Sequence, residues 1–172
     1  MDDFDKNNAL TVLGMETTCD ETAASVVSFD KNGISKLHSN IIHSQYEEHS
    51  EFGGIVPEVA ARSHLNNISF IVAKAIENSK NEINNIDAVA VSCGPGLIGG
   101  LLVGSLFGKA YALSRNIPFI PINHLEAHVL SPRLFEKIHF PYLALLVSGV
   151  HTQLLYVESL DTIKRLGTTL GE

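Results

Sequence analysis

Residues 86–93 read IDAVAVSC and decide the fold, because this stretch is continuously apolar apart from Asp87 and Ser92. A short apolar run of this kind predicts a buried strand. It leads into Gly94-Pro95-Gly96, and a helix is expected after it at about residues 98–115. Residues 118–122 predict the next strand, which runs directly into another helix that carries two histidines.

The same alternation of elements extends to both sides of this stretch. Apolar residues at helical spacing predict a long amphipathic helix over about residues 57–79, with Pro57 in its first turn. Further strands are predicted at residues 9–15, 22–29, 34–44, 142–148 and 152–157, and from residue 163. This order predicts a mixed α/β domain.

Composition excludes several classes of protein. The chain has 172 residues, 45% hydrophobic and 18% charged, which is ordinary for a globular domain. Cys19 and Cys93 are too few for a disulfide framework, and the acidic N-terminus does not resemble a signal peptide, so we expect a cytoplasmic protein with no membrane association. Because the net charge is −7, any RNA binding needs a local basic patch or a partner.

His124 and His128 stand four residues apart on the predicted helix. Side chains at this spacing share one helix face, so both imidazoles can reach one metal ion, although two ligands leave its coordination incomplete. Glu126 points away from both rings, and with Asn123 as N-cap it fits a capping box. A role at the metal is the alternative for Glu126, but its position does not match the H-E-x-x-H pattern of metallopeptidases.

Three polar turns follow predicted strands, at residues 17–21, 94–96 and 148–151. Such turns can cradle phosphate with their backbone N–H groups, and together they suggest a nucleotide site at one edge of the sheet. Asp20 and Glu21 in the first turn are candidates for proton transfer or for orienting substrate, and a solvated turn is the alternative. The glycines of residues 94–96 fit a functional loop and a plain tight turn equally well.

Glycines recur every four residues from Gly96 to Gly108 along the predicted helix. A bare stripe of this kind permits close approach of another element. We interpret Gly100, Gly104 and Gly108 as sites of tight helix packing.

Five stretches of the sequence resemble, in order, the motifs of the TsaD family, which are tRNA N6-adenosine threonylcarbamoyltransferases formerly labelled Gcp or O-sialoglycoprotein endopeptidases. The stretches are residues 16–22, 49–65, 94–97, 123–128 and 146–153. The resemblance covers nearly the whole chain after residue 8, and we expect residues 1–8 to form a flexible tail.

This resemblance implies an ASKHA fold, in which a ribonuclease-H-like lobe has a mixed sheet with helices on both faces. Residues 1–172 would form the single N-terminal lobe, without the C-terminal lobe that carries the family's third metal ligand, an Asp, and its adenosine site. The implied reaction transfers a threonylcarbamoyl group from threonylcarbamoyl-adenylate to N6 of adenosine 37 in ANN-decoding tRNAs. We expect the isolated lobe to be inactive.

The resemblance also assigns residues to roles. His124 and His128 match the metal ligands, for which iron is favoured and zinc is possible, and Glu21 matches an acidic position near the reacting centre, next to Asp20. The segment that binds the intermediate corresponds to Leu146, Val147, Ser148, Gly149, Val150 and His151. The implied partners are tRNA, a TsaB-like paralogue, a TsaE-like ATPase and the threonylcarbamoyl-adenylate synthase that supplies the intermediate.

One residue departs from the family pattern. Val150 stands where the family usually has glycine, and a β-branched residue is costly there if the turn needs a positive φ or close approach to phosphate. Two alternatives to an active enzyme remain open: a non-catalytic module that pairs with a partner, and a truncated remnant of the family.

Overall fold

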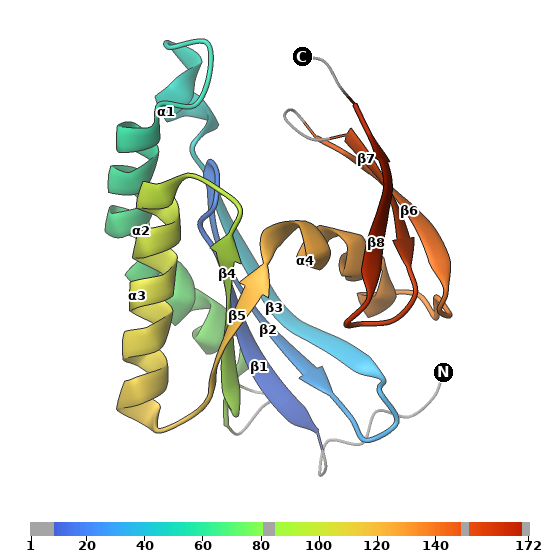
Figure 1. Cartoon of the computed structure of the whole chain (residues 1–172). Helices are drawn as coiled ribbons and strands as arrows, with labels where there is room; N and C mark the ends of the chain where they lie inside the picture. The colour runs from blue at the N-terminus through green and yellow to red at the C-terminus, as the bar shows by residue number, and fades with distance from the viewer. Residues whose placement is uncertain (1–8, 81–84, 149–151, 170–172) are drawn as a thin grey trace. The chain divides into compact units, whose positions relative to one another are not determined.

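The computed structural model describes residues 9–80, 85–148 and 152–169 (Figure 1). Its Cα positions divide into two compact units, residues 1–124 and 125–172. The expected single lobe over residues 1–172 therefore stays a prediction, and the expected tail at residues 1–8 lies outside the described residues. Within the described ranges, no helix is both long and apolar enough to cross a membrane.

The first unit contains a five-stranded sheet in the order β3-β2-β1-β4-β5. Its strands are β1 (Leu10–Glu16), β2 (Glu21–Phe29), β3 (Ser35–Ser44), β4 (Ala88–Gly94) and β5 (Phe119–Asn123). Strands β1, β2 and β3 form an antiparallel meander, whereas β1, β4 and β5 run parallel to one another. This mixed sheet confirms the predicted α/β class, and the stretch at residues 86–93 supplies its central parallel strand.

Two long helices and one short helix accompany this sheet: α1 (Tyr46–Ser50), α2 (Pro57–Ser79) and α3 (Ile98–Arg115). Helix α2 packs on β2 and β3, α3 packs on β4, and the two helices contact each other (Figure 1). The family resemblance implies helices on both faces of the sheet; within this unit, the two long helices share one face (Figure 1).

The core of this unit lies between these helices and the sheet. Leu13, Val26, Val89 and Val91 are fully buried and belong to one core cluster, which also contains residues of α2. Each such side chain contributes about 1.5–3 kcal/mol through removal of its apolar surface from water. This packing fixes the sheet, and therefore the turns that leave its strands.

The glycine stripe of α3 faces the sheet and the turn after β1. A Cβ atom on Gly100 would lie 2.1 Å from the carbonyl oxygen of Thr17, and one on Gly108 would lie 2.5 Å from Cγ2 of Val91. A Cβ on Gly104 would lie 2.2 Å from the hydroxyl oxygen of Thr17. The interpretation of these glycines as sites of tight packing is confirmed, and the stripe is not available to a partner.

The second unit is built on a three-stranded antiparallel sheet in the order β6-β7-β8. These strands span Tyr142–Val147, Thr152–Val157 and Ile163–Thr168. Helix α4 (His124–Leu130) and a short 3₁₀ helix precede them, and a small core gathers around Val129, Leu155 and Val157.

Candidate functional site

The carboxyl ends of three parallel strands meet at one edge of the first sheet. Strand β1 ends at Glu16, β4 ends at Gly94 and β5 ends at Asn123, followed directly by His124. In open α/β sheets, the crevice beyond the carboxyl ends of the strands is the usual place for a ligand. The candidate residues of the first unit lie at this edge.

Glu16 and His124 form the centre of this edge. The carboxylate oxygen Oε2 of Glu16 lies 3.0 Å from Nδ1 of His124, and the Thr18 hydroxyl lies 3.1 Å from the same nitrogen. Oε1 of Glu16 accepts the backbone N–H of Thr18. Burial raises the pKa of Glu16, but hydrogen bonds from Ser92, Thr18 and His124 outweigh it and hold the pKa below the usual value. Glu16 is therefore ionised at neutral pH.

Asp20 and Glu21 follow in the same turn. Partial burial raises the pKa of Glu21, and a hydrogen bond to the Asp20 carboxyl and the charge of Asp20 raise it further. Two neighbouring carboxyls that interact in this way favour sharing one proton. Glu21 therefore takes up a proton at a higher pH than an isolated glutamate would.

Cys19 lies between these acidic groups. Burial raises the pKa of its thiol, and the charges of Glu16, Asp20 and Glu21 raise it further. Only the thiolate is a good nucleophile, and a raised pKa reduces the thiolate fraction at neutral pH.

A buried histidine on α2, His64, is hydrogen-bonded to the turn at residues 17–21. Nε2 of His64 donates to the main-chain carbonyl of Cys19 at 3.1 Å, so Nδ1 of the same ring accepts from the Thr22 hydroxyl at 2.8 Å. The side-chain amide nitrogen of Gln45 lies 3.1 Å from this Nδ1. His64 and Gln45 have no exposed surface. Buried polar groups of this kind hold a unique geometry when all are hydrogen-bonded.

The network continues to α1. Nε2 of His49 donates to Oε1 of Gln45 at 3.1 Å, and Nδ1 of His49 accepts the backbone N–H of Val56 at 3.4 Å. Each of these hydrogen bonds has a donor and an acceptor only if the rings of His49 and His64 both carry their proton on Nε2. The contacts therefore assign the same tautomer to both histidines. The two ends of the stretch at residues 49–65 are thereby joined through one glutamine.

Helix α3 holds the turn from the other side. The Thr17 hydroxyl donates to the carbonyl of Gly100 at 2.9 Å, and the N–H of Leu97 donates to the carbonyl of Thr18 at 2.9 Å. A Cβ on Gly96 would lie 2.7 Å from the Cβ of Thr18. The turn at residues 94–96 therefore serves as a close support for the turn at residues 17–21.

The structure brings together three of the predicted site residues in the first unit, namely Asp20, Glu21 and His124. His128 lies one helical turn after His124 in α4 and is exposed. In the second unit, Leu146 and Val147 end β6 and Ser148 follows it. Gly149, Val150 and His151 lie outside the described residues. Among the described residues, no three His, Cys, Asp or Glu side chains are grouped to hold a metal ion.

Sequence reasoning gives no role to four residues that shape this site: Glu16, Gln45, His49 and His64. His49 and His64 lie at the ends of a motif, but their contact through Gln45 joins three separate elements. Glu16 is the last residue of β1. A carboxylate at the end of a largely buried strand is the one sequence feature that indicates a functional role for it.

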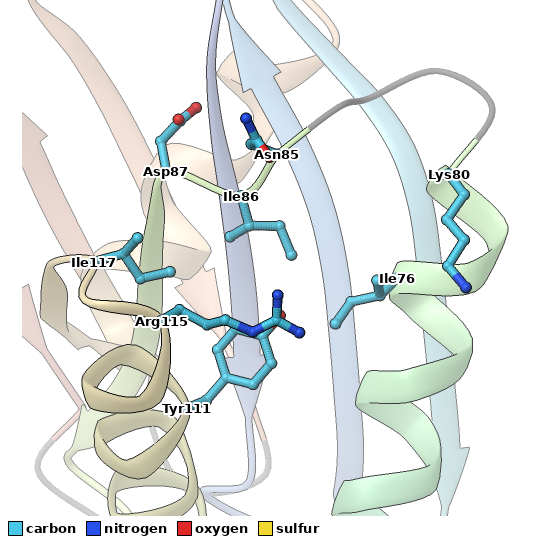
Figure 2. A pocket seen from close by; sticks show the side chains of 8 residues that line it. All are labelled: Ile76, Lys80, Asn85, Ile86, Asp87, Tyr111, Arg115 and Ile117. Carbon is cyan, nitrogen blue, oxygen red and sulfur yellow. The ribbon is translucent and has the colours of Figure 1, made fainter.

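A cavity of about 500 Å³ lies at the other end of the sheet. Figure 2 shows it between the last turns of α2 and α3, where the guanidinium of Arg115 lies beside the Tyr111 ring and Lys80 stands across from it. Asp87 borders this cavity and accepts the backbone N–H of Thr11 at 2.8 Å. The cavity faces the amino ends of β1 and β4, so it is separate from the site around Glu16.

Comparison with known proteins gives a consistent family. The family model "TsaD: tRNA N6-adenosine threonylcarbamoyltransferase" matches residues 36–172. A protein named tRNA N6-adenosine threonylcarbamoyltransferase from Pelagibacter ubique is 49% identical over 166 residues, covering 96% of this chain and 46% of the relative. A relative of the same name from Caulobacter vibrioides is 48% identical, covering 97% of this chain and 46% of its own. The chain thus spans about half the length of the curated relatives it matches.

Solved structures support the fold. YeaZ from Pseudomonas aeruginosa superposes with a TM-score of 0.55 at 14% identity, covering 92% of this chain and 65% of that chain. The PPX-GPPA enzyme of Aquifex aeolicus gives a TM-score of 0.51 at 9% identity, covering 94% of this chain and 52% of that one. These likenesses confirm the ASKHA-type fold that the sequence predicts.

Proposed function

Because this chain belongs to the TsaD family of tRNA N6-adenosine threonylcarbamoyltransferases, we propose that it takes part in transferring a threonylcarbamoyl group from threonylcarbamoyl-adenylate to tRNA. The acceptor is N6 of adenosine 37 in ANN-decoding tRNAs. The N6 nitrogen attacks the carbamoyl carbon, the bond from that carbon to the phosphate oxygen breaks, AMP leaves, and N6 gives up one proton.

The observation that carries this proposal is the carboxyl pair of Asp20 and Glu21 beside His124, at the carboxyl edge of the sheet. The attacking amine must lose a proton, and a positioned base accelerates such a step by about 10²–10⁴-fold. We assign this role to Glu21, since burial and Asp20 raise its pKa toward neutrality. Asp20 holds the pair in place through their hydrogen bond.

His124 and His128 would hold one divalent metal ion, with iron favoured and zinc possible. The donor set fits: Nδ1 of His124 faces a carboxylate, which leaves the lone pair on Nε2, and imidazole nitrogen suits both metals. When bound, the ion supplies Lewis-acid polarisation of the carbamoyl carbonyl and a contact for phosphate oxygen.

The segment from Leu146 to His151 would bind threonylcarbamoyl-adenylate. Of its residues, Leu146 and Val147 end β6 and Ser148 follows that strand. The Ser148 hydroxyl adds a hydrogen-bonding group. This assignment rests on the resemblance of residues 146–153 to the family motif.

A TsaB-like paralogue would dock on the outer side of α3. Ile98, Leu102 and Leu106 are 72%, 51% and 61% exposed, and their spacing places them along one side of the helix, opposite the buried glycines. Exposed apolar patches of this kind mark interaction surfaces. A TsaE-like ATPase, tRNA and the synthase of the intermediate complete the proposed set of partners.

The test is transfer of the threonylcarbamoyl group to unmodified tRNA, with synthetic threonylcarbamoyl-adenylate, metal and partner proteins supplied. Two proteins would be assayed: the 172-residue chain, and the Pelagibacter ubique relative with its matching segment replaced by this chain. We expect modified adenosine from the chimera, its loss in the His128→Ala chimera, and no product from the chain alone. A stable chimera that binds tRNA and makes no product contradicts the proposed function.

The exposed side of α3 also favours a second candidate, a module that binds the partner without catalysing transfer. The two candidates differ in the expected partner affinity and in the expected activity of the chimera. A module gives a stable heterodimer whose affinity is unchanged by metal and by His128→Ala, and its chimera makes no modified adenosine.

A further inference from the structure

A contact between β1 and the start of α4 assigns a role to Glu16, for which the sequence predicts none. Oε2 of Glu16 lies 3.0 Å from Nδ1 of His124, and the two side chains are 30% and 17% exposed. A carboxylate has no hydrogen to donate, so the hydrogen of this bond belongs to Nδ1. The tautomer of His124 is therefore set by a residue that lies 108 positions earlier in the chain.

We propose that Glu16 is a positioning residue, which holds His124 in the tautomer and ring orientation that present Nε2 to a metal ion. Histidines that bind metals almost always donate the other ring N–H to a carboxylate or carbonyl, and removal of such a partner typically costs about 10–100-fold in metal affinity. This inference rests on the proposed function insofar as His124 is taken as a ligand.

The surroundings of Glu16 show that its own orientation is fixed. Oε1 accepts the backbone N–H of Thr18, so the two carboxylate oxygens serve two different donors. The Thr18 hydroxyl lies 3.1 Å from Nδ1 of His124 and 3.8 Å from Sγ of Cys19, so it can accept from the ring while it donates to sulfur. Both contacts hold the same proton on Nδ1.

The turn that supports Glu16 is itself rigid. The carbonyl of Thr18 accepts from Leu97, and the carbonyl of Cys19 accepts from His64. Glu16 closes β1, whose central residue Leu13 is fully buried in the core. The carboxylate is thus anchored to the sheet, and it can restrain a histidine that stands at the first position of a helix.

The first test needs no metal. Long-range ¹H–¹⁵N NMR on the histidine-labelled chain distinguishes an imidazole protonated on Nδ1 from one protonated on Nε2. We expect His124 on Nδ1 in the wild-type chain, and a mixture or the opposite tautomer in Glu16→Gln, where the amide can donate to Nδ1. A wild-type His124 protonated on Nε2 overturns the inference, whatever the function of the chain.

The second test is titration of the metal-free chain with zinc and with iron(II) in the absence of oxygen. We expect Glu16→Gln to weaken the affinity by about 10–100-fold. The matched control is Glu126→Gln, which removes the same charge from the helix of the two histidines and should change the affinity less than twofold. Circular dichroism checks that each variant is folded.

The outcomes separate the inference from the proposed function. Wild-type affinity in a folded Glu16→Gln chain overturns the role of Glu16 and leaves the metal site standing. A wild-type chain whose metal binding is indifferent to His124→Ala and to His128→Ala contradicts the proposed metal site, whereas the NMR measurement still decides the contact between Glu16 and His124.

Discussion

Nε2 of His64 lies 3.1 Å from the main-chain carbonyl oxygen of Cys19 and ties the middle of α2 to the turn that carries Asp20 and Glu21. The ring is fully buried, and Gln45 connects it to a second histidine, His49. A turn at the edge of a sheet would otherwise depend on its own few hydrogen bonds. Here the core of the unit determines where the two carboxyl groups stand.

Gln45→Leu should destabilise the chain by about 2 kcal/mol or more, because it leaves Nε2 of His49 and Nδ1 of His64 without their glutamine partner in a buried site. Urea unfolding followed by circular dichroism measures this change. Glu47→Gln, in the exposed first turn of the same short helix, is the control and should change the stability by less than about 0.5 kcal/mol. Equal stability of the two variants would show that the network contributes nothing.

Stability should fall as the pH drops below about 6.5, in part because of His64. Burial lowers the pKa of His64 below its ordinary value, despite the opposing effect of the Cys19 carbonyl. The folded ring therefore stays neutral at a pH where the unfolded chain takes up a proton, so protons favour unfolding. Unfolding free energies measured between pH 7.5 and pH 5.5 check this. His64→Gln should be less stable at pH 7.5 and should depend less on pH, and an unchanged dependence would contradict the assignment.

Gly100→Ala should destabilise the chain by about 1–3 kcal/mol, although alanine is the better helix former. A Cβ at this position would meet the Thr17 carbonyl at 2.1 Å, and neither backbone can yield without moving the turn or the helix. Gly54→Ala is the matched control, since a Cβ there meets nothing within 4 Å, and it should leave the stability unchanged or raise it by up to about 1 kcal/mol. Thermal unfolding of the two variants decides the matter.

The rate of transfer should rise with pH along a limb that reports Glu21. Its pKa is raised by burial and by Asp20, so the limb should lie above the usual range of a carboxylate. Asp20→Asn removes one raising influence and should move the limb to lower pH, whereas Glu21→Gln should abolish it with a rate loss of about 10²-fold or more. Single-turnover rates of the chimera across pH measure this. A limb unmoved by Asp20→Asn would exclude Glu21 as the base.

Leu106→Glu should weaken the complex with a TsaB-like paralogue by at least about 10-fold, because it places a charge in the apolar face of α3. The side chain is 61% exposed, so the fold of the free chain should not change. Glu77→Lys, a charge change on the neighbouring α2, serves as the control. Analytical ultracentrifugation measures both, and an unchanged affinity in Leu106→Glu would place the docking surface elsewhere.

The sequence by itself determined the strands and the long helices of this protein, but it did not predict the short helix α1. The short apolar run at residues 86–93 predicts a buried strand, and the structure has β4 at Ala88–Gly94. The Asn-Gly pair at residues 32–33 lies between β2 and β3. Period and turn chemistry are local properties, so they also located the histidine helix and the polar turns. The five ordered motifs are sufficient to indicate the family.

Only the tertiary structure decided how the candidate site is supported. Glu16 and His124 are 108 residues apart, and the network from His49 to Cys19 runs from α1 through Gln45 and α2 to the turn after β1. From the sequence, the glycine stripe of α3 could pack against a partner or against the chain's own core. The structure shows that it packs against the core, because Cβ atoms on these glycines would meet Thr17 and Val91. Such contacts depend on how strands and helices pack in space, which the period of a sequence does not encode. The local sequence therefore determined which residues are chemically able to serve in a site. The packing of strands and helices determined which of these residues lie in contact.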